Sequence, residues 1–143
     1  MSLNISLFSE NTNFIYSAND RLSSWIQNVL EEERKKGSNI NFIFCDDATL
    51  HALNVEYLKH DTYTDIITFP LSEDKTIGGD IYISVDRVRE NAYEFKSNFD
   101  EELHRVIIHG ILHLCGYKDK TPEDQLLMRK KENHYLEGLP SLM

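Results

Sequence analysis

The sequence lacks the segments that would direct a protein into or across a membrane. It contains no run of about 18 apolar residues, so an ordinary transmembrane helix is excluded. The opening stretch, MSLNISLFSEN, has neither a basic start nor an apolar core and does not form a secretory signal. Only two cysteines are present, Cys45 and Cys115, and neither lies in a C-x-x-C motif. We therefore expect a cytoplasmic protein whose two thiols are free.

The sequence also lacks any stretch rich in proline, glycine or serine that would mark a linker, and it contains no internal repeat. Its 143 residues suit one domain and leave little length for a second. Hydrophobic residues make up 41% of the chain, which is enough to build a core. We therefore expect residues 1–143 to form a single soluble globular domain.

Positive charge is scarce, because 15 lysines and arginines face 24 aspartates and glutamates, and the net charge is −9. Phosphate binding generally needs clustered basic side chains, so this balance argues against a protein that grips nucleic acid over its whole surface. A local basic cluster near the C-terminus consists of Lys118, Lys120, Arg129, Lys130 and Lys131. Taken alone, such a cluster is better interpreted as a solvated helix face. Any RNA contact would therefore use a confined basic patch or a partner protein.

Hydrophobic spacing predicts four short strands and five helices. The strands are expected at 4–8, 40–44, 64–69 and 79–84, and the helices around 22–30, 50–57, 88–95 and 103–115, with a fifth from Thr121 onward. Gly37 stands where the first helix is expected to end, and Asp46 or Asp47 is expected to cap the second. Leu50, Leu53 and Tyr57 in the second helix are expected to point inward, and Val88, Ala92 and Phe95 mark the third helix.

This order of elements predicts an α+β fold, in which a small mixed four-stranded sheet packs with about five helices. The helix at 103–115 is expected to be central and buried, because its second half is apolar on nearly every side. The last helix has a well-marked start, with Thr121 as the cap, Pro122 at the first position and Asp124 three residues after the cap.

The motif that carries chemistry is HGILHLCGYKD, which spans residues 109–119. His109 and His113 are four residues apart, so a helix would project both side chains from one face. Gly116 can adopt a left-handed conformation and end the helix, and Asp119 can then supply a third ligand from the loop. Three protein ligands leave a position open for water, as in catalytic zinc sites. The motif therefore predicts one divalent metal ion, with zinc favoured, held by His109, His113 and Asp119.

A second interpretation of the motif remains open, in which the histidines bond to the backbone and Asp119 is an ordinary turn residue. Two histidines on a buried helix need partners of some kind, because unsatisfied buried polar groups are costly. Cys115 is expected to be a core residue and not a ligand, since it lies only two residues after His113. Gly110 stands where the H-E-x-x-H zinc proteases place their glutamate base, which argues against peptide hydrolysis.

These residues resemble the YbeY family of bacterial rRNA maturation factors, which are metal-dependent endoribonucleases. HGILHLCGYKD is similar to the family pattern H-G-x-L-H-L-x-G-Y-D-H, TDIITFP (64–70) to T-D-V-L-S-F-P, and GDIYIS (79–84) to G-D-I-x-I-S. Leu53 and Asn54 match the L-N that precedes the first strand block. The resemblance spans roughly residues 40 to 137, and it implies a single YbeY-like metallohydrolase domain over residues 1–143.

The chain departs from the family pattern at four positions. Asp119 stands where the third ligand is usually histidine, and this carboxylate would reduce the net charge of the metal site. Leu58 stands where the family tends to carry an arginine, so another group must steady phosphate if that is the arginine's role. Tyr63 replaces the usual proline, and Lys118 replaces the usual aspartate.

The resemblance implies an endoribonuclease of the single-strand type that acts on ribosomal RNA precursors in the cytoplasm, near ribosomal or ribosome-assembly proteins. His109, His113 and Asp119 would act through a metal-bound water, which the ion makes more acidic, and the general base is not identified. Thr64 and Asp65 either border the substrate cleft and brace a ligand or simply cap a strand end. Lys118 is a weaker candidate for a substrate contact.

Two other function classes remain open at this point. The chain is alternatively a metal-stabilised module that binds the ribosome or RNA without cutting, which Leu58 in place of arginine favours. It is alternatively a metallohydrolase of another ester or amide. Gly110, in place of the protease glutamate, argues against peptides as the substrate of such an enzyme. A nuclease assay separates a cutting enzyme from a binding module.

Overall fold

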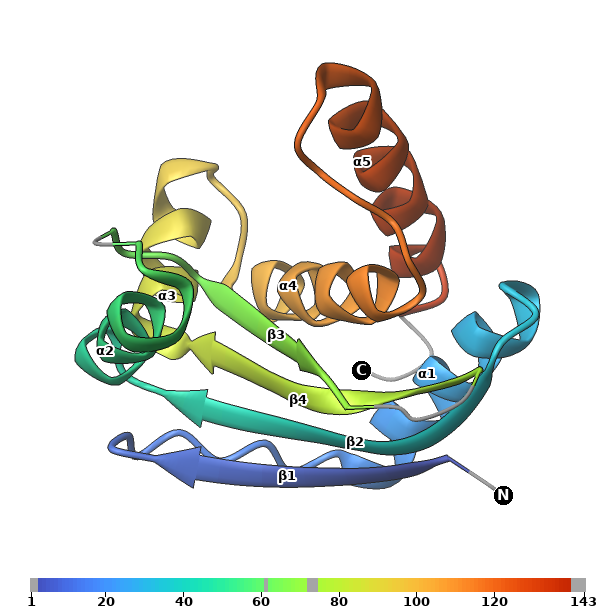
Figure 1. Cartoon of the computed structure of the whole chain (residues 1–143), viewed down its shortest axis with the longest axis horizontal. Helices are drawn as coiled ribbons and strands as arrows, with labels where there is room; N and C mark the ends of the chain where they lie inside the picture. The colour runs from blue at the N-terminus through green and yellow to red at the C-terminus, as the bar shows by residue number, and fades with distance from the viewer. Residues whose placement is uncertain (1–2, 61, 72–74, 140–143) are drawn as a thin grey trace.

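The computed structural model describes residues 3–60, 62–71 and 75–139, and these form an α+β fold with four strands and five helices (Figure 1). In chain order the elements are β1 (Asn4–Glu10), α1 (Asn19–Glu32), β2 (Lys36–Cys45), α2 (Asp47–Leu58), β3 (Ile66–Pro70), β4 (Thr76–Ser84), α3 (Val85–Glu94), α4 (Phe99–Leu114) and α5 (Pro122–Leu136). The predicted fold class is confirmed.

The four strands form one mixed sheet in the order β1-β2-β4-β3. Strands β1, β2 and β4 run parallel, and β3 pairs antiparallel with β4 at one edge. The register places Phe42 beside Ile81 and Phe44 beside Ile83. Alternate residues of a strand share a face, so these four side chains project to the same side of the sheet. All four are completely buried, and they form the strand half of the main core.

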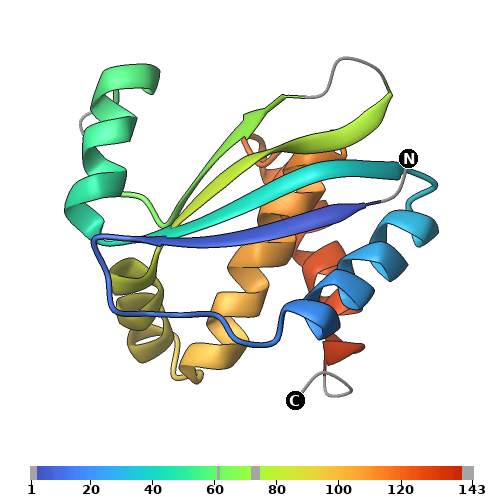
Figure 2. The ribbon, with the colours of Figure 1, turned by 90° about the horizontal axis from the view of Figure 1, so that it is seen from below.

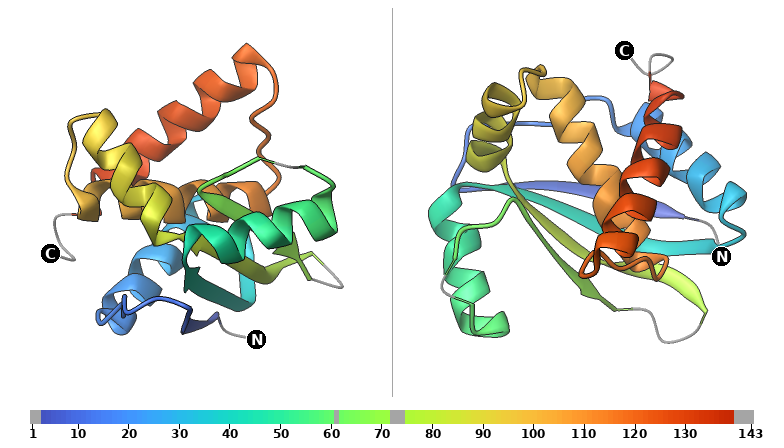
Figure 3. Two further views of the ribbon diagram at one scale, coloured as in Figure 1. Left: turned by 90° about the vertical axis from the view of Figure 1, so that its left-hand side faces the viewer. Right: turned by 90° about the horizontal axis from the view of Figure 1, so that it is seen from above.

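Helices α1, α3 and α4 cover this face of the sheet, as seen from below in Figure 2. Helix α5 packs on α4, so that α4 lies between the sheet and α5 (Figures 1 and 3). The opposite face carries α2 near one end of the strands, where Leu50 forms a smaller cluster with Cys45 and Ile67. Among the described residues, no helix is both long and apolar enough to span a membrane.

Helix α4 packs between the sheet and α5, and most of its residues from Glu102 to Leu112 are buried. Asn98 caps its start by accepting a hydrogen bond from the Glu101 backbone N–H at 2.7 Å. At Gly110 the helix lies very close to the sheet, because a Cβ there would be 2.8 Å from Ile66 Cδ1 and 3.2 Å from Ile81 Cγ2. The position that holds glutamate in H-E-x-x-H proteases is therefore a packing contact in this chain, with no space for that side chain.

The predicted caps of α2 and α5 are confirmed. The Asp46 side chain accepts a hydrogen bond from the Thr49 N–H at 2.9 Å at the start of α2. Helix α5 begins with a reciprocal capping box between Thr121 and Asp124, with Pro122 in its first turn. The start of α5 is therefore fixed by local sequence.

Two local predictions were wrong. Helix α1 ends at Glu32 because Arg34 adopts a left-handed φ of 59°, and Gly37 lies inside β2 instead. Tyr57 is 58% exposed, although it was expected to point inward, and Phe95, which marks the third predicted helix, is 65% exposed. Tyr57 is the penultimate residue of α2 and Phe95 directly follows α3, so each lies where its helix is leaving the core.

Asn54 occupies a buried place on α2, where its side chain donates to the Thr62 carbonyl at 2.8 Å, as predicted for a residue that bonds backbone. Both cysteines are free, as expected. Burial raises the pKa of the Cys45 thiol to about 12 and that of Cys115 to about 11. The two thiols are therefore poorly reactive, and Cys115 packs against the main core.

His104 is a buried histidine of α4 whose two ring nitrogens both have partners. Its Nδ1 lies 2.6 Å from the Asp100 carbonyl and its Nε2 lies 2.7 Å from the Tyr16 hydroxyl. A carbonyl only accepts, so Nδ1 carries the proton and the Tyr16 hydroxyl donates to Nε2. Burial lowers the pKa of His104, against a smaller opposing effect of the Asp100 carbonyl. The folded chain therefore holds His104 neutral.

We expect His104 to make the folded chain less stable at mildly acidic pH. The pKa of His104 is lower in the folded than in the unfolded chain. Its contribution to the free energy of unfolding is therefore complete above about pH 6.5 and is lost as the pH falls below that value. One such group changes the free energy of unfolding by at most about 1.4 kcal/mol per pH unit. Urea unfolding between pH 7 and 5 should show that the free energy of unfolding falls less steeply for His104→Gln than for the wild type. His60→Gln, at an exposed site, serves as the control and should keep the wild-type slope.

We also expect Gly110→Val to destabilise the chain by about 1–3 kcal/mol, because the added side chain meets Ile66 and Ile81 in a packed core. The same side chain introduced by Glu101→Val, at an exposed site of α4, should cost less than about 1 kcal/mol. Chemical unfolding of both variants measures how much each change lowers the free energy of unfolding. Equal stabilities would mean that the isoleucine side chains move aside without cost.

Candidate metal centre

The last two turns of α4 present His109 and His113 on one side of the helix. Their Nε2 atoms lie 3.0 Å apart, as the four-residue spacing predicts. The side chains are 22% and 25% exposed, so both rings lie at the boundary between the core and solvent. Two potential metal ligands therefore come from a single rigid element.

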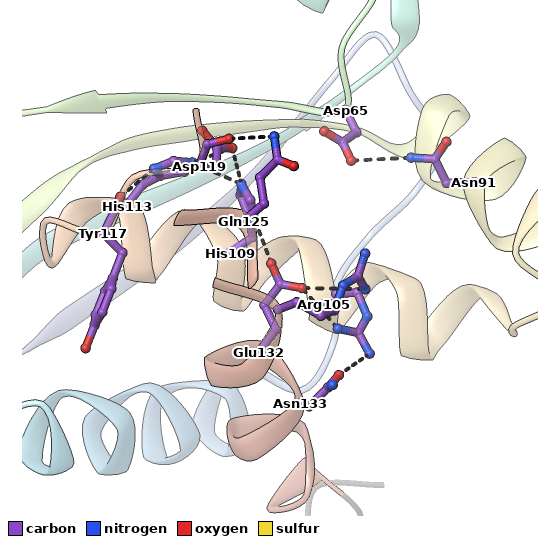
Figure 4. A network of polar contacts seen from close by, with 11 residues as sticks. Asp65, Asn91, Arg105, His109, His113, Tyr117, Asp119, Gln125, Glu132 and Asn133 are labelled. Atoms are coloured by element: carbon purple, nitrogen blue, oxygen red, sulfur yellow. Dashed lines mark hydrogen bonds and ion pairs between the residues drawn. The ribbon is translucent and has the colours of Figure 1, made fainter. Parts of the chain in front are cut away.

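A tight turn after α4 brings the chain back toward these histidines. Gly116 has a φ of +107°, which confirms its predicted role in ending the helix. The Tyr117 N–H donates to the Leu112 carbonyl and the Gly116 N–H to the His113 carbonyl, both at 3.0 Å, which together form a Schellman motif. Three residues after the glycine, Asp119 lies beside the two imidazoles (Figure 4).

The three side chains converge at distances that suit a metal ion. Asp119 Oδ2 lies 3.2 Å from His109 Nε2 and 3.3 Å from His113 Nε2. Ligand atoms that are each about 2.0–2.1 Å from a tetrahedral ion lie about 3.3 Å from one another, close to the separations in this cluster. Among the described residues, this is the one group of three or more histidine, cysteine or acidic side chains arranged to hold an ion. The donor set therefore fits a divalent metal.

Both histidines have their second ring nitrogen engaged outside the cluster. His109 Nδ1 lies 2.6 Å from Glu132 Oε2, and His113 Nδ1 lies 3.0 Å from the Tyr117 carbonyl. With the proton on Nδ1 in each ring, both Nε2 lone pairs face Asp119 and are available to a metal. The bond from His113 to backbone is therefore compatible with metal binding, although it was considered as an alternative to it.

Glu132 is a site residue that the sequence analysis did not identify. It is 4% exposed and also accepts a hydrogen bond from Arg105 Nη1 at 3.0 Å. Burial alone would raise the pKa of Glu132, but hydrogen bonds from His109 and Arg105 hold it below its usual range. Burial would likewise lower the pKa of His109, but the carboxylates of Glu132 and Asp119 raise it. Glu132 thus fixes the orientation of the first histidine.

One sequence signal marks Glu132 as an acidic residue that needs a partner, although it does not say which partner. It lies between Met128 and Tyr135, and these three residues form the buried face of α5 at helical spacing. An acidic residue within such an apolar face needs a partner, and the neighbouring buried helix supplies one in His109.

A cleft of about 840 Å³ opens beside the cluster, between α4, α5 and the start of β3. His109 and Asp119 form part of its wall, so a metal at the cluster would face the cleft. Arg105 and Arg129 provide positive charge along the same wall. The cleft is large enough for a small organic ligand or a few atoms of a polymer backbone.

Of the three predicted substrate residues, only Asp65 lines this cleft. Its Oδ2 accepts from Asn91 Nδ2 at 3.3 Å, and burial raises its pKa although the nearby His109 opposes the shift. The Thr64 hydroxyl donates to the Ile66 carbonyl at 3.4 Å. This contact agrees with the alternative in which Thr64 caps a strand end. Lys118 is exposed and is not part of the wall of the cleft.

We expect Glu132→Gln to weaken binding of a divalent ion by about 10–100-fold, the usual cost of removing a carboxylate that orients a metal-binding histidine. Competition with a chromophoric chelator measures this affinity. Glu123→Gln, at an exposed position on the same helix, is the matched control and should bind as the wild type does. Equal affinities for the two variants would show that Glu132 does not orient the ligand.

Comparison with known proteins identifies the family of this chain. The model of the family Endoribonuclease YbeY matches residues 7–140. The chain is 56% identical to Endoribonuclease YbeY of Christiangramia forsetii over 128 residues (90% of this chain and 89% of the relative), and 50% identical to that of Flavobacterium johnsoniae over 126 residues (88% and 91%). The solution structure of TM1509 from Thermotoga maritima is similar, with a TM-score of 0.66, 29% identity and coverage of 96% of this chain and 93% of that one. The chain therefore belongs to the Endoribonuclease YbeY family.

Proposed function

We propose that this chain is a metal-dependent endoribonuclease of the single-strand type that acts on ribosomal RNA precursors in the cytoplasm. The observation that carries the proposal is the convergence of His109, His113 and Asp119 at 3.0–3.3 Å on the wall of a cleft. Membership of the Endoribonuclease YbeY family supplies the reaction class, which is hydrolysis of RNA.

In this proposal the two histidines and Asp119 hold one divalent ion, with zinc favoured by the nitrogen-rich donor set. When bound, the ion supplies a Lewis acid for the scissile phosphate and a more acidic water. Glu132 holds the ring of His109 in place, and the Tyr117 carbonyl does so for His113. The carboxylate of Asp119 gives the site less positive charge than a third histidine would, and this is expected to shift its preference among metals.

Phosphate contacts are assigned to the arginines of the cleft. Leu58, at the position where the family tends to carry arginine, is 42% exposed on the last turn of α2. Arg129 lines the cleft, and its Nη1 lies 3.7 Å from Glu132 Oε1 in a loose ion pair. Its side chain is 59% exposed, so its guanidinium is accessible to a phosphate. Arg105 is largely committed to Glu132 and Asn133. Arg129 is therefore the residue best placed to replace the missing arginine.

Asp65 is proposed as a cleft residue that faces substrate or water near the metal. Its carboxylate is oriented by Asn91, and burial raises its pKa above the usual range of an aspartate. These are properties of a group that exchanges protons during hydrolysis. Thr64 is assigned to the strand end, and Lys118 to the rim outside the cleft.

The acidic balance of the chain suggests that binding depends on other molecules besides RNA. With a net charge of −9, general attraction to RNA is weak. We therefore include ribosomal or ribosome-assembly proteins as partners that bring the chain to its substrate. A binding module that does not cut is the less favoured alternative, because the relatives are named endoribonucleases.

The experiment that tests the proposal is cleavage of a ribosomal RNA precursor by purified protein, with and without a chelator. Wild-type cleavage should stop on chelation and return with added zinc or another divalent ion. His113→Ala should lower the rate by more than about 100-fold, because an outer partner of a ligand alone is worth about 10–100-fold. His60→Ala, at an exposed site away from the cluster, should cleave as the wild type does.

Two results would contradict the proposal in different ways. Undiminished cleavage by His113→Ala would remove the cluster from the mechanism. A wild type that binds metal and RNA but never cleaves would instead favour the binding module.

A further inference from the structure

A second polar cluster joins the end of α1 to the α4–α5 loop and to α5, and it is centred on the carboxylate of Glu33. Its side chain is only 7% exposed. Three donors surround it: the Tyr117 hydroxyl at 2.6 Å, the Lys131 ammonium at 3.0 Å and the Tyr135 hydroxyl. Burial alone would raise the pKa of Glu33, but these hydrogen bonds hold it below its usual range. A buried, ionised carboxylate with three donors is a strong and directional contact.

The backbone of Glu33 is itself rigidly held. It is the C-cap residue of α1, and Arg34 directly after it adopts a left-handed φ of 59°. The Lys35 N–H donates to the Leu30 carbonyl at 2.8 Å, which closes the helix end. Helix α1 is anchored in the main core by Leu30 and four other buried side chains. Glu33 is therefore a fixed acceptor and not a mobile surface acid.

Tyr117 connects this fixed acceptor to the candidate metal centre. Its N–H donates to the Leu112 carbonyl and its carbonyl accepts from His113 Nδ1, both at 3.0 Å. In Figure 4 its ring points away from the histidines, and the hydroxyl at the ring end is the group that bonds Glu33. Lys131 also lies over the ring, 5.5 Å from its centroid. The residue is thus held at its amide, its carbonyl and its hydroxyl.

We propose that Glu33, acting through the Tyr117 hydroxyl, positions the loop that carries the Tyr117 carbonyl and Asp119 so that His113 and Asp119 meet at metal-binding distance. Glu33 is a positioning residue and touches neither the ion nor the substrate. The inference rests on the proposed metal-dependent function. It adds a contact from α1, some 80 positions earlier in the chain, to the contacts that shape the metal centre.

Tyr135 provides an internal control for this role. Its hydroxyl donates to the same carboxylate, Glu33 Oε2, but Tyr135 is on α5 and not in the ligand-bearing loop. Its carbonyl accepts from Trp25 Nε1 at 3.0 Å, a bond that Tyr135→Phe retains. Removing either tyrosine hydroxyl therefore costs one hydrogen bond to Glu33, but only Tyr117→Phe releases the loop.

The experiment compares Tyr117→Phe, Tyr135→Phe and Glu33→Gln with the wild type in two measurements. The first is the Zn²⁺ dissociation constant from chelator competition, supported by the visible spectrum of the Co²⁺-loaded protein, which reports ligand geometry. The second is urea unfolding of the metal-free protein. Tyr117→Phe should weaken Zn²⁺ binding by about 10-fold, because losing a residue that supports a metal ligand usually costs about 10–100-fold in affinity. It should also alter the Co²⁺ spectrum. Tyr135→Phe should lose similar stability and keep the wild-type affinity and spectrum.

Glu33→Gln should weaken Zn²⁺ binding about as much as Tyr117→Phe does. If this variant does not fold, the two tyrosine variants decide alone. Wild-type affinity and spectrum in Tyr117→Phe would overturn the proposal and leave Glu33 as a tether between helices. Equal loss of affinity in both tyrosine variants would also overturn it, because the effect would then follow general stability. A wild type that binds no divalent ion would overturn the proposed function itself, and this inference with it.

Discussion

The packing of α4 against the sheet is the constraint on which the rest of the structure depends. The second half of the helix is apolar on nearly all sides, so it must be covered by the sheet on one side and by α5 on the other. Gly110 allows the helix backbone to approach Ile66 and Ile81 closely. His109 and His113 are carried into this half-buried position by the helix, and each polar ring nitrogen then needs a partner.

These partners come from two different parts of the chain, helix α5 and the loop that precedes it. Glu132 reaches His109 from α5, and the Tyr117 carbonyl reaches His113 from the turn after α4. Asp119 completes the cluster from the same loop, and the capping box at Thr121 fixes where that loop ends. The hydrogen bonds leave the Nε2 atoms facing Asp119, and a divalent ion would satisfy all three groups together.

The departures from the family pattern change the charge around this centre. An aspartate at position 119 adds a negative charge where histidine is usual, and Leu58 removes a positive one. The change at position 119 makes the cleft less attractive to phosphate, whereas Leu58 is at the end of α2 and does not line the cleft. Arg105 and Arg129 line the cleft and partly compensate, although Arg105 is paired with Glu132. The same cleft is also lined by Asp65, Glu102, Asp119 and Glu132, so Arg105 and Arg129 are the groups through which it can attract phosphate.

The sequence by itself determined the elements and the part of the site that is local. The spacing of His109 and His113, the turn at Gly116 and the cap at Thr121 each depend on a few neighbouring residues, so their geometry could be predicted. The ends of helices were less predictable, because Arg34 ended α1 in a left-handed conformation that glycine usually adopts. Only the tertiary structure decided the partners from other elements. Glu132 and Glu33 meet the motif through the packing of α5 and α1 on α4, and no local pattern encodes a contact between residues so far apart in sequence.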